Sequence, residues 1–419
     1  MNSEEKREAY FVSNPDVFSA YKEILRINDT LDYKFTDRKF REIKQYAIEN
    51  TAFYKNYSID DTFPVMTKMD YINNYDAIRS TEVFSEPLHI TSTSGSTGIP
   101  FKVEQNKEKR NRTIADLKAF GTYALFESHD KMIQLRSYCG KKLDRTIDEK
   151  ENIWRYDIFD LQSGGGIDSF IEFVLEYKPV VIFSYVSALE TICEYILSSG
   201  KSYDFNVKSI LVGAEALTKE VYEKFYKVFK CPVFDRYSDM EMGILAQREF
   251  GKLFRINKAS YYFECLKLDK DEPTKEGELG RLVFTDLFNH AFPMIRYDTG
   301  DLGTYKTIDG EIYIETVYGR SLDQIYNEKM EIINPHDLTR SMSGITGIVQ
   351  WQLIQKSINC FVLRCIAKST FQQFEAIDRL RKILGTGVKI NVELVDDIPV
   401  LNSQKRKAII NEMIVKQYK

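Results

Sequence analysis

The stretch Thr91-Ser92-Thr93-Ser94-Gly95-Ser96-Thr97-Gly98-Ile99-Pro100 decides how the rest of this sequence is interpreted. Its first eight residues all carry a hydroxyl group or are glycine, and apolar, strand-like residues lie on both sides. Glycines let backbone N–H groups approach phosphate oxygens closely, and hydroxyls add further donors. No glycine directly precedes Lys102, so the stretch is not a Walker A loop. It therefore predicts a phosphate-binding loop between two strands, with a flexible Ser/Gly linker as the alternative.

The composition is that of a globular chain with room for two or three domains. Among its 419 residues 43% are hydrophobic, and the formal net charge is −4. A nucleic-acid-binding surface needs a basic excess, so no nucleic-acid partner is expected. The six cysteines are scattered without a C-x-x-C pair, and the four histidines are far apart. This pattern predicts neither a disulfide framework nor a protein-built metal cage.

The N-terminal residues 1–7 are polar and lack the apolar core of a signal peptide. No run of about 18 apolar residues occurs, so no membrane span is expected. Both observations favour a cytoplasmic location.

The centre of the chain alternates between strand and helix patterns. Short apolar runs at 180–183, 209–212 and 232–234 are separated by helical patterns at 187–197 and 218–229. Such alternation predicts a parallel sheet covered by helices. Ligands of such sheets bind beyond the carboxyl ends of the strands, which makes the residues after each run candidate site loops.

The pattern changes twice further along the chain. From residue 254 to about residue 314, strands joined by turns predict a barrel-like β part. After residue 320, strands and helices predict a compact α+β domain that ends in a helix at 403–415. We therefore expect an α/β fold with a large N-terminal domain, 1–319, of parallel helix-covered sheets plus the barrel-like part. A small, mobile α+β domain, 320–419, follows it.

Two acidic segments are candidates for nucleotide and metal binding. In Arg296-Tyr297-Asp298-Thr299-Gly300-Asp301, two carboxylates flank a glycine, and carboxylates accept hydrogen bonds from the paired hydroxyls of a ribose. Asp235-Arg236-Tyr237-Ser238-Asp239-Met240-Glu241-Met242-Gly243 follows a predicted strand and carries carboxylates that suit magnesium. The alternative for each is a polar surface turn.

Two basic positions complete the candidates. Arg320, at the predicted domain boundary, offers a guanidinium group for phosphate. Lys405 lies in the basic run 402–407 at the start of the predicted last helix. The alternative for Lys405 is a solvated charge run.

Taken together and in this order, the segments resemble the adenylate-forming superfamily of acyl-CoA synthetases and adenylation domains, over about residues 60–415. Within it, the sequence looks similar to the phenylacetate–CoA ligase-like branch, which includes adenylate-forming proteins of capsular polysaccharide biosynthesis. The further cues are Phe63-Pro64-Val65-Met66-Thr67-Lys68, Lys178-Pro179, Ser184-Tyr185-Val186-Ser187 and the short C-terminal domain.

The resemblance implies an ATP site with residues in named roles. The phosphate loop over the β,γ-phosphates is Thr93, Ser94, Gly95, Ser96, Thr97 and Gly98. The adenine pocket is formed by Gly213, Ala214 and Glu215, and by Tyr237, which stacks on the purine, with Ser238 beside it. Asp301 binds the ribose hydroxyls, Arg320 contacts ribose or phosphate, and Glu241 holds Mg²⁺. Lys405 approaches the α-phosphate and the carboxylate during adenylation.

The sequence departs from the family pattern at several of these positions. Ser238 stands where a glycine is usual, and Gln404 replaces the glycine before the C-terminal lysine. Leu322 stands where an acid is frequent, with Asp323 next to it, so the hinge residue stays open. Some relatives carry a Cys/His zinc cluster, and this chain has no residues to build one.

The resemblance leaves three functions open. The first is an acid–CoA ligase, the second an adenylating enzyme that passes the acyl group to an amine such as an amino sugar, and the third a nucleotide-binding relative without activity. A homodimer is a further expectation, since related ligases form dimers. For the acid itself, Arg136 and Lys141 favour a polar or doubly charged molecule, and Tyr138 and Tyr185 an aromatic one.

Overall fold

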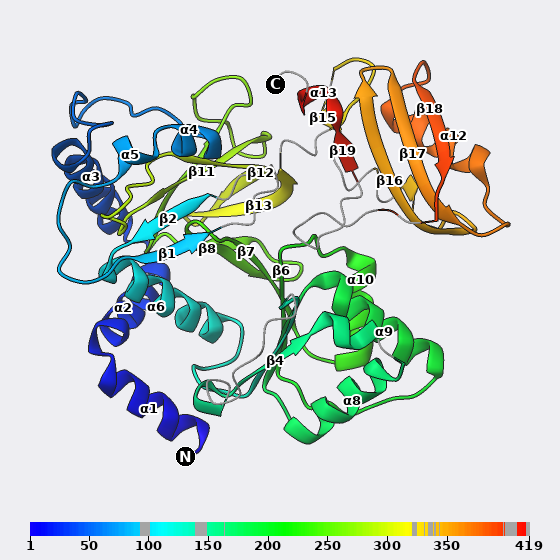
Figure 1. The fold of residues 1–419 in the computed structure, drawn as a ribbon, viewed down its shortest axis with the longest axis horizontal. Helices are drawn as coiled ribbons and strands as arrows, with labels where there is room; N and C mark the ends of the chain where they lie inside the picture. The colour runs from blue at the N-terminus through cyan, green and yellow to red at the C-terminus, as the bar shows by residue number, and fades with distance from the viewer. Residues whose placement is uncertain are drawn as a thin grey trace.

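The computed structural model describes residues 1–92, 101–138, 149–162, 164–320, 325–330, 332–333, 338, 341–342, 344–396, 398 and 409–415. Figure 1 shows helices packed around a long sheet, and a smaller group of strands and helices formed by the chain after residue 325. Within these residues, no helix combines the length and the apolar character needed to cross a membrane.

Helices dominate the N-terminal part of the chain. A capping box formed by Asn2 and Glu5 starts the first of them. Apolar residues of α2 and α6 form one buried cluster, which joins this part to the sheet. The elements are α1 (Ser3–Ser13), α2 (Pro15–Asn28), α3 (Tyr33–Asn50), α4 (Lys68–Asn73), α5 (Tyr75–Ile78), β1 (His89–Ser92), β2 (Lys102–Gln105) and α6 (Lys107–Tyr123).

Among the described residues, eleven strands form one sheet in the order β10-β11-β12-β13-β9-β8-β7-β6-β5-β3-β4. Strands β4, β3, β5, β6 and β7 run parallel, and from β7 onward each neighbour is antiparallel. The bounds are β3 (Met132–Arg136), β4 (Ile153–Asp157), β5 (Val181–Ser184), β6 (Ser209–Gly213), β7 (Val233–Asp239), β8 (Gly243–Glu249), β9 (Phe254–Ile256), β10 (Tyr261–Leu266), β11 (Gly280–Asp286), β12 (Tyr297–Ile308) and β13 (Glu311–Arg320).

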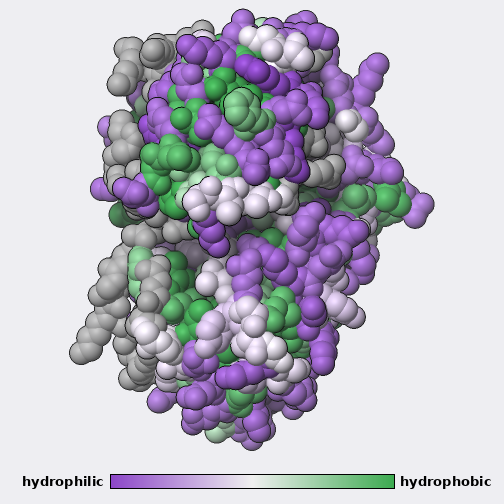
Figure 2. Space-filling model, turned by 90° about the vertical axis from the view of Figure 1, so that its right-hand side faces the viewer, coloured by the Kyte–Doolittle hydropathy of each residue, from purple (hydrophilic) through white to green (hydrophobic). Residues whose placement is uncertain are grey.

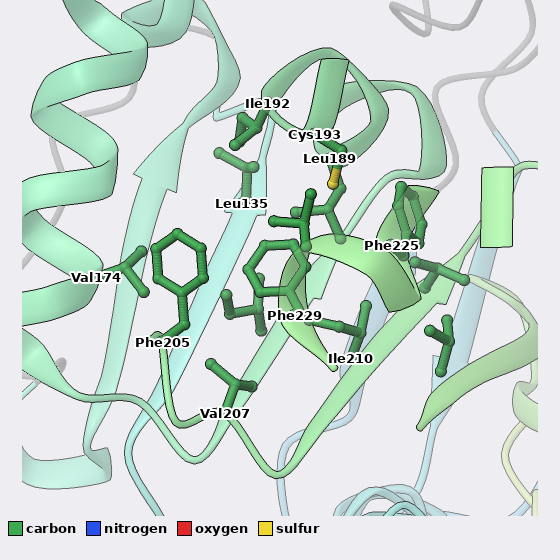
Figure 3. Packing of buried hydrophobic residues seen from close by; sticks show 14 of the residues in the cluster. Leu135, Val174, Leu189, Ile192, Cys193, Phe205, Val207, Ile210, Phe225 and Phe229 are labelled. Carbon is green, nitrogen blue, oxygen red and sulfur yellow. The ribbon is translucent and has the colours of Figure 1, made fainter. Parts of the chain in front are cut away.

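The predicted strand–helix alternation is present, and its helices bury one face of the parallel strands. The crossover elements are η1 (Ile158–Gln162), α8 (Gly166–Tyr177), α9 (Val186–Ser199) and α10 (Lys219–Phe229). Helix α9 buries apolar residues at the spacing of one helix face, Leu189, Ile192, Cys193 and Ile196. They pack with residues of β3, β6 and α10 in the core shown in Figure 3. This core fixes the parallel strands, whose carboxyl ends carry the candidate site.

The C-terminal part forms a second, four-stranded sheet, β18-β17-β16-β19, with its own buried core. Of the predicted helix 403–415, Glu412–Val415 is helical (α13), but Ile409–Asn411 is a strand (β19) that pairs parallel to β16. Residues 403–408 lie outside the described residues. The bounds are β14 (Ile325–Tyr326), β15 (Ile332–Ile333), β16 (Ile348–Ser357), β17 (Cys360–Ala367), α12 (Gln373–Leu384), β18 (Lys389–Leu394), β19 (Ile409–Asn411) and α13 (Glu412–Val415).

The predicted domain boundary at 319/320 stays a prediction. In the described residues, β13 ends at Arg320 and the next strand, β14, begins at Ile325. On the face of the molecule in Figure 2, hydrophobic residues form small areas separated by hydrophilic ones. Scattered apolar residues of this kind are ordinary on protein surfaces and give no argument for a docking partner.

Candidate nucleotide and acid site

Tyr237 and Asp301 meet where β7 and β12 approach each other. The Tyr237 hydroxyl donates to Asp301 Oδ2 at 2.8 Å and lies 3.1 Å from Thr299 Oγ1. Burial, with the negative charge of Asp301 as the second cause, raises the pKa of Tyr237 well above its ordinary value. The phenol therefore stays protonated and holds one oxygen of the carboxylate in place.

The segment that carries Asp301 is fixed at its start by Arg296. This residue has a left-handed backbone, φ 51°, which is uncommon for a side chain of its size. Its guanidinium group donates to both oxygens of Glu264 at 3.0–3.2 Å and to the Phe63 carbonyl at 2.7 Å. These bonds compensate the strained backbone and set the course of the chain into β12.

The two carboxylates of this segment have different surroundings. Asp298 accepts from the Gly300 N–H at 2.9 Å and pairs with Arg281 at 3.1 Å. Asp301, by contrast, faces Tyr237 and is the Cα partner of Arg320 across the β12–β13 ladder. Asp298 therefore stabilises the turn, whereas Asp301 faces β7. The backbone of Arg320 lies next to Asp301.

Glu241 is a nearly buried carboxylate in the turn between β7 and β8. Its side chain is 4% exposed, and Lys68 Nζ lies 3.2 Å from its Oε1. Asp239 accepts from the Met242 N–H at 2.6 Å through Oδ1, whereas its Oδ2 is buried without a hydrogen-bond partner. Burial first, and then the charge of Glu241, raises the pKa of Asp239 to about 8. An orphaned carboxylate oxygen beside Glu241 gives an all-oxygen donor set that fits Mg²⁺.

The predicted phosphate loop, Thr93–Gly98, lies outside the described residues, but its two ends are described. Ser92 pairs with Lys102 in the antiparallel β1–β2 ladder, so the loop starts and ends at one place. Phe101 is fully buried in the cluster that contains Met242 and Tyr297, and its ring lies 5.7 Å from Lys68 Nζ. The ends of the loop therefore lie on the same side of the molecule as Glu241 and the start of β12.

Gly213 is the last residue of β6, paired with Arg236 of β7, and Ala214 and Glu215 follow it. A Cβ on Gly213 would lie 3.1 Å from the Arg236 carbonyl, so the position favours glycine. Ala214 has φ 70°, a conformation that residues with a Cβ rarely adopt. Glu215 accepts from the N–H and the hydroxyl of Ser187 at 2.7 and 3.0 Å, which ties this loop to the start of α9.

Of the remaining predicted residues, some are described by the structure and others lie outside the described residues. Ser238 is exposed on β7, at a register shift against β8, a type of irregularity that re-aims side chains. Lys405, Leu322, Asp323, Gln404 and Lys141 lie outside the described residues. Sequence reasoning gave no role to Lys68, Thr299 or Arg236. Their contacts join segments far apart in the chain, and local spacing carries no signal for them.

Comparison with solved structures identifies the fold. A 2-hydroxyisobutyryl-CoA ligase in the postadenylation state with an acyl-AMP superimposes with a TM-score of 0.70 at 17% identity, covering 92% of this chain and 90% of that one. ATP-bound MatB from Rhodopseudomonas palustris gives 0.57 at 12% identity, covering 81% and 69%. The AMP complex of an O-succinylbenzoate coenzyme A synthetase from Bacillus subtilis gives 0.56 at 13% identity, covering 76% and 67%.

Comparison of sequences narrows the relationship. A phenylacetate-coenzyme A ligase of Thermus thermophilus is 27% identical over 154 residues, 35% of this chain and 34% of that protein. One from Pseudomonas putida is 27% identical over 145 residues, 33% of each chain. The match thus spans about a third of these curated relatives. A family model described as the CapK C-terminal domain matches residues 325–412.

The chain therefore shares the fold of these solved enzymes, which are acyl-CoA ligases. Within the adenylate-forming superfamily, the matches confirm the predicted resemblance to the phenylacetate–CoA ligase-like branch, with a CapK-type C-terminal domain. The predicted fold class, a large N-terminal part with a helix-covered sheet and a small C-terminal α+β part, is also confirmed.

Proposed function

We propose that the protein activates a carboxylic acid by joining it to AMP from Mg-ATP, and then transfers the acyl group to coenzyme A. The observation that carries this proposal is the Tyr237–Asp301 pair, a tyrosine hydroxyl held 2.8 Å from a carboxylate at the strand ends. An aromatic face and a carboxylate side by side suit a purine and the hydroxyls of its ribose. The adenylate-forming fold supports the same assignment.

The other nucleotide contacts follow from the same placement. Thr93 to Gly98 would bind the β,γ-phosphates, and Gly213 to Glu215 would line the adenine. Ser238 lies beside the stacking ring, and Arg320 would reach ribose or phosphate from the strand paired with Asp301. The conformation of Ala214 and the bonds of Glu215 to Ser187 support a loop of fixed shape here.

The reaction joins a carboxylate oxygen to the α-phosphorus and breaks its bond to pyrophosphate. The protein's part is positioning and charge stabilisation, because phosphoryl and nucleotidyl transfer need little covalent help. Glu241 would hold Mg²⁺, which when bound neutralises phosphate charge. Lys68, 3.2 Å from Glu241, compensates the buried carboxylate in the free protein. Lys405 would stabilise the charge that develops at the α-phosphate.

A second candidate function differs only in the acceptor. In it the acyl group passes to an amine, such as an amino sugar of a surface polysaccharide, and the match of residues 325–412 to the CapK C-terminal domain is the reason to test it. For either acceptor, we propose that the small domain rotates about residues near Arg320 between the two half-reactions.

Pyrophosphate release from ATP with a panel of acids tests the activation step. We expect release with at least one acid, and mass spectrometry should then show the acyl-adenylate. Addition of coenzyme A should consume the adenylate and give a thioester. Consumption only by an added amino sugar would select the second candidate. ATP binding without release for any acid would instead favour a nucleotide-binding protein without activity.

A further inference from the structure

Two arginines lie in one row near the carboxyl edge of the parallel sheet. Arg136 is the last residue of β3, and Arg236 lies on β7 with its Cα paired to Gly213 of β6. The registers of β3, β5, β6 and β7 place Arg136, Gly213 and Arg236 in one row across the sheet. Residues in one row of a parallel sheet point to the same face. Both guanidinium groups therefore belong to one face of the carboxyl edge.

The two side chains converge on one aromatic ring. The Arg136 Cζ lies 4.5 Å from the centre of the Phe183 ring and 5.3 Å from that of Tyr185. The Arg236 Cζ lies 5.5 Å from the same Phe183 ring. Both guanidinium groups therefore lie against the Phe183 ring. Gly213, in the same row, has no side chain, and a Cβ at this position would lie 3.9 Å from the Phe183 ring.

In the described part of the chain, neither arginine has a carboxylate to neutralise it. Asp235, beside Arg236, pairs with Arg248 at 3.1 Å. Asp157, opposite Arg136, accepts from the backbone N–H groups of Tyr138 and Phe159. Arg136 Nε and Arg236 Nη2 are buried without a hydrogen-bond partner.

Two unpaired cations at one ring are costly, because burial and mutual repulsion both disfavour their charges. Arg236 is only 6% exposed, and its one side-chain hydrogen bond to a described residue runs from Nε to Gln247, which is neutral. Burial, and then the charge of Arg136, lowers the pKa of Arg236 to about 9. Two buried arginines without a carboxylate partner at the end of the strands are typical of a binding site for an anion.

The two arginines lie next to Tyr237 but on the opposite face of the strand ends, and Gly213 of the proposed adenine pocket lies in their row. Arg236 and Tyr237 are consecutive on β7, so their side chains point to opposite faces of the strand. An acid that reaches the α-phosphate at this edge, with the nucleotide on the Tyr237 face, would extend over the Arg236 face. Its far end then meets the two guanidinium groups.

We propose that the acid substrate carries a second anionic group, such as a second carboxylate, which binds between Arg136 and Arg236. This inference rests on the proposed function and adds the substrate class. The guanidinium groups replace the water that the second anionic group loses, and their forked N–H groups donate hydrogen bonds to the planar carboxylate. Phenylacetate and other acids with a single charge lack this interaction.

Matched acids test the proposal in the full-length protein. Initial rates of pyrophosphate release are measured with adipate against hexanoate, and with 4-carboxyphenylacetate against phenylacetate. The variants are Arg136→Gln, Arg236→Gln, Arg236→Lys and the control Arg38→Gln, an exposed arginine of α3. We expect kcat/KM for the dianionic acids to fall roughly tenfold to hundredfold in both Gln variants, less in Arg236→Lys, and not in the control.

The monocarboxylates and the KM for ATP should change little in the same variants. Equal losses for the mono- and dianionic acids, or a raised KM for ATP, would place the arginines on the reacting carboxylate or on phosphate and overturn the proposal. Melting temperatures close to wild type exclude misfolding, and Arg236→Lys or Arg136→Lys replaces the corresponding Gln variant if that variant fails to fold.

A binding measurement separates this proposal from the proposed function. If no acid releases pyrophosphate, the activation step is wrong, and calorimetric titration of the same four acids still tests the arginine pair. Tighter binding of the dianionic acids, lost in Arg236→Gln and kept in Arg38→Gln, supports the pair as the anion site. Equal affinity for both members of each pair, or no binding of either dianionic acid, contradicts it.

Discussion

The Tyr237 hydroxyl donates a 2.8 Å hydrogen bond to Asp301, although 64 residues separate them in the chain. The bond joins the end of the parallel strands to the antiparallel half of the sheet. A residue proposed to stack on the purine thereby orients the carboxylate proposed to bind the ribose. The two proposed roles are coupled through this hydrogen bond. Substitutions of Tyr237 and Asp301 should therefore both weaken ATP binding, but by different amounts.

Asp301→Asn should weaken ATP binding by roughly tenfold to hundredfold, because charge-assisted hydrogen bonds to the ribose hydroxyls are lost. Tyr237→Phe keeps the ring and removes the hydroxyl, with its contacts to Asp301 and Thr299, so a smaller loss, roughly twofold to tenfold, is expected. Calorimetric titration with ATP measures both. Asp309→Asn, in the exposed turn between β12 and β13, is the control. ATP affinity that is unchanged in Asp301→Asn would remove the ribose assignment.

Glu241→Gln should reduce pyrophosphate release by about a hundredfold or more, because a preorganised charge in the site is lost. ATP titrated without magnesium should bind the variant at least as well as wild type, since the carboxylate no longer repels the phosphates and Lys68 loses its 3.2 Å partner. Glu223→Gln, an exposed glutamate of α10, is the matched control. A variant whose rate responds to magnesium as the wild type does would show that Glu241 is not the metal ligand.

Lys405→Ala should slow formation of the acyl-adenylate by about a hundredfold or more, because the charge stabilisation at the α-phosphate is removed. Consumption of a supplied acyl-adenylate should change far less, since that step no longer involves pyrophosphate departure. Single-turnover rates of the two half-reactions, with Lys407→Ala as the neighbouring control, give the comparison. Equal loss in both half-reactions would contradict the role of Lys405.

Lys118 gives a pH-dependent contribution to stability. It lies on α6, donates to Ser128 at 2.6 Å, and burial lowers its pKa from 10.5 to about 8. Between these values the unfolded chain binds more protons than the folded one, so stability from this group rises as pH increases from about 8 to 10.5. Below pH 8, the folded protein carries the full penalty of the buried charge.

Lys118→Met should therefore be more stable than wild type at pH 7, by an amount on the order of 1–3 kcal/mol. The advantage should shrink as pH approaches 10. Thermal melts of the two proteins at pH 7, 8.5 and 10 measure the difference. Lys22→Met, an exposed lysine that also lies over an aromatic ring, should show no such trend. A difference in melting temperature between Lys118→Met and wild type that is the same at all three pH values would exclude Lys118 as the source of the pH-dependent stability.

Much of the fold could be predicted because its signals are local. The apolar runs at β5, β6 and β7 and the helical spacing in α9 and α10 specify buried parallel strands and their covers. The end of the chain is different. A helical pattern was assigned to 403–415, yet the pairing of Leu353 with Ile409 makes 409–411 a strand. That pairing depends on β16, which lies more than fifty residues earlier in the chain. It therefore cannot be predicted from the local secondary-structure propensity of residues 409–411.

The site residues could be proposed from the local sequence, but their contacts could not. The segments around Tyr237, Glu241 and Asp301 could be proposed from residue type and order. The two carboxylates of 298–301 have different partners, because Asp298 pairs with Arg281 and Asp301 accepts from Tyr237, and the local sequence does not show this. The Lys68–Glu241 pair spans 173 residues of sequence. The convergence of Arg136 and Arg236 on Phe183 likewise requires the register of four strands.

Exchange of labelled pyrophosphate into ATP, measured with each acid of the panel, tests the central claim most directly. The account predicts exchange that requires both an acid and magnesium, is lost in Asp301→Asn and Glu241→Gln, and is accompanied by an acyl-adenylate. A protein that binds ATP through Asp301 yet exchanges no pyrophosphate with any acid would contradict it.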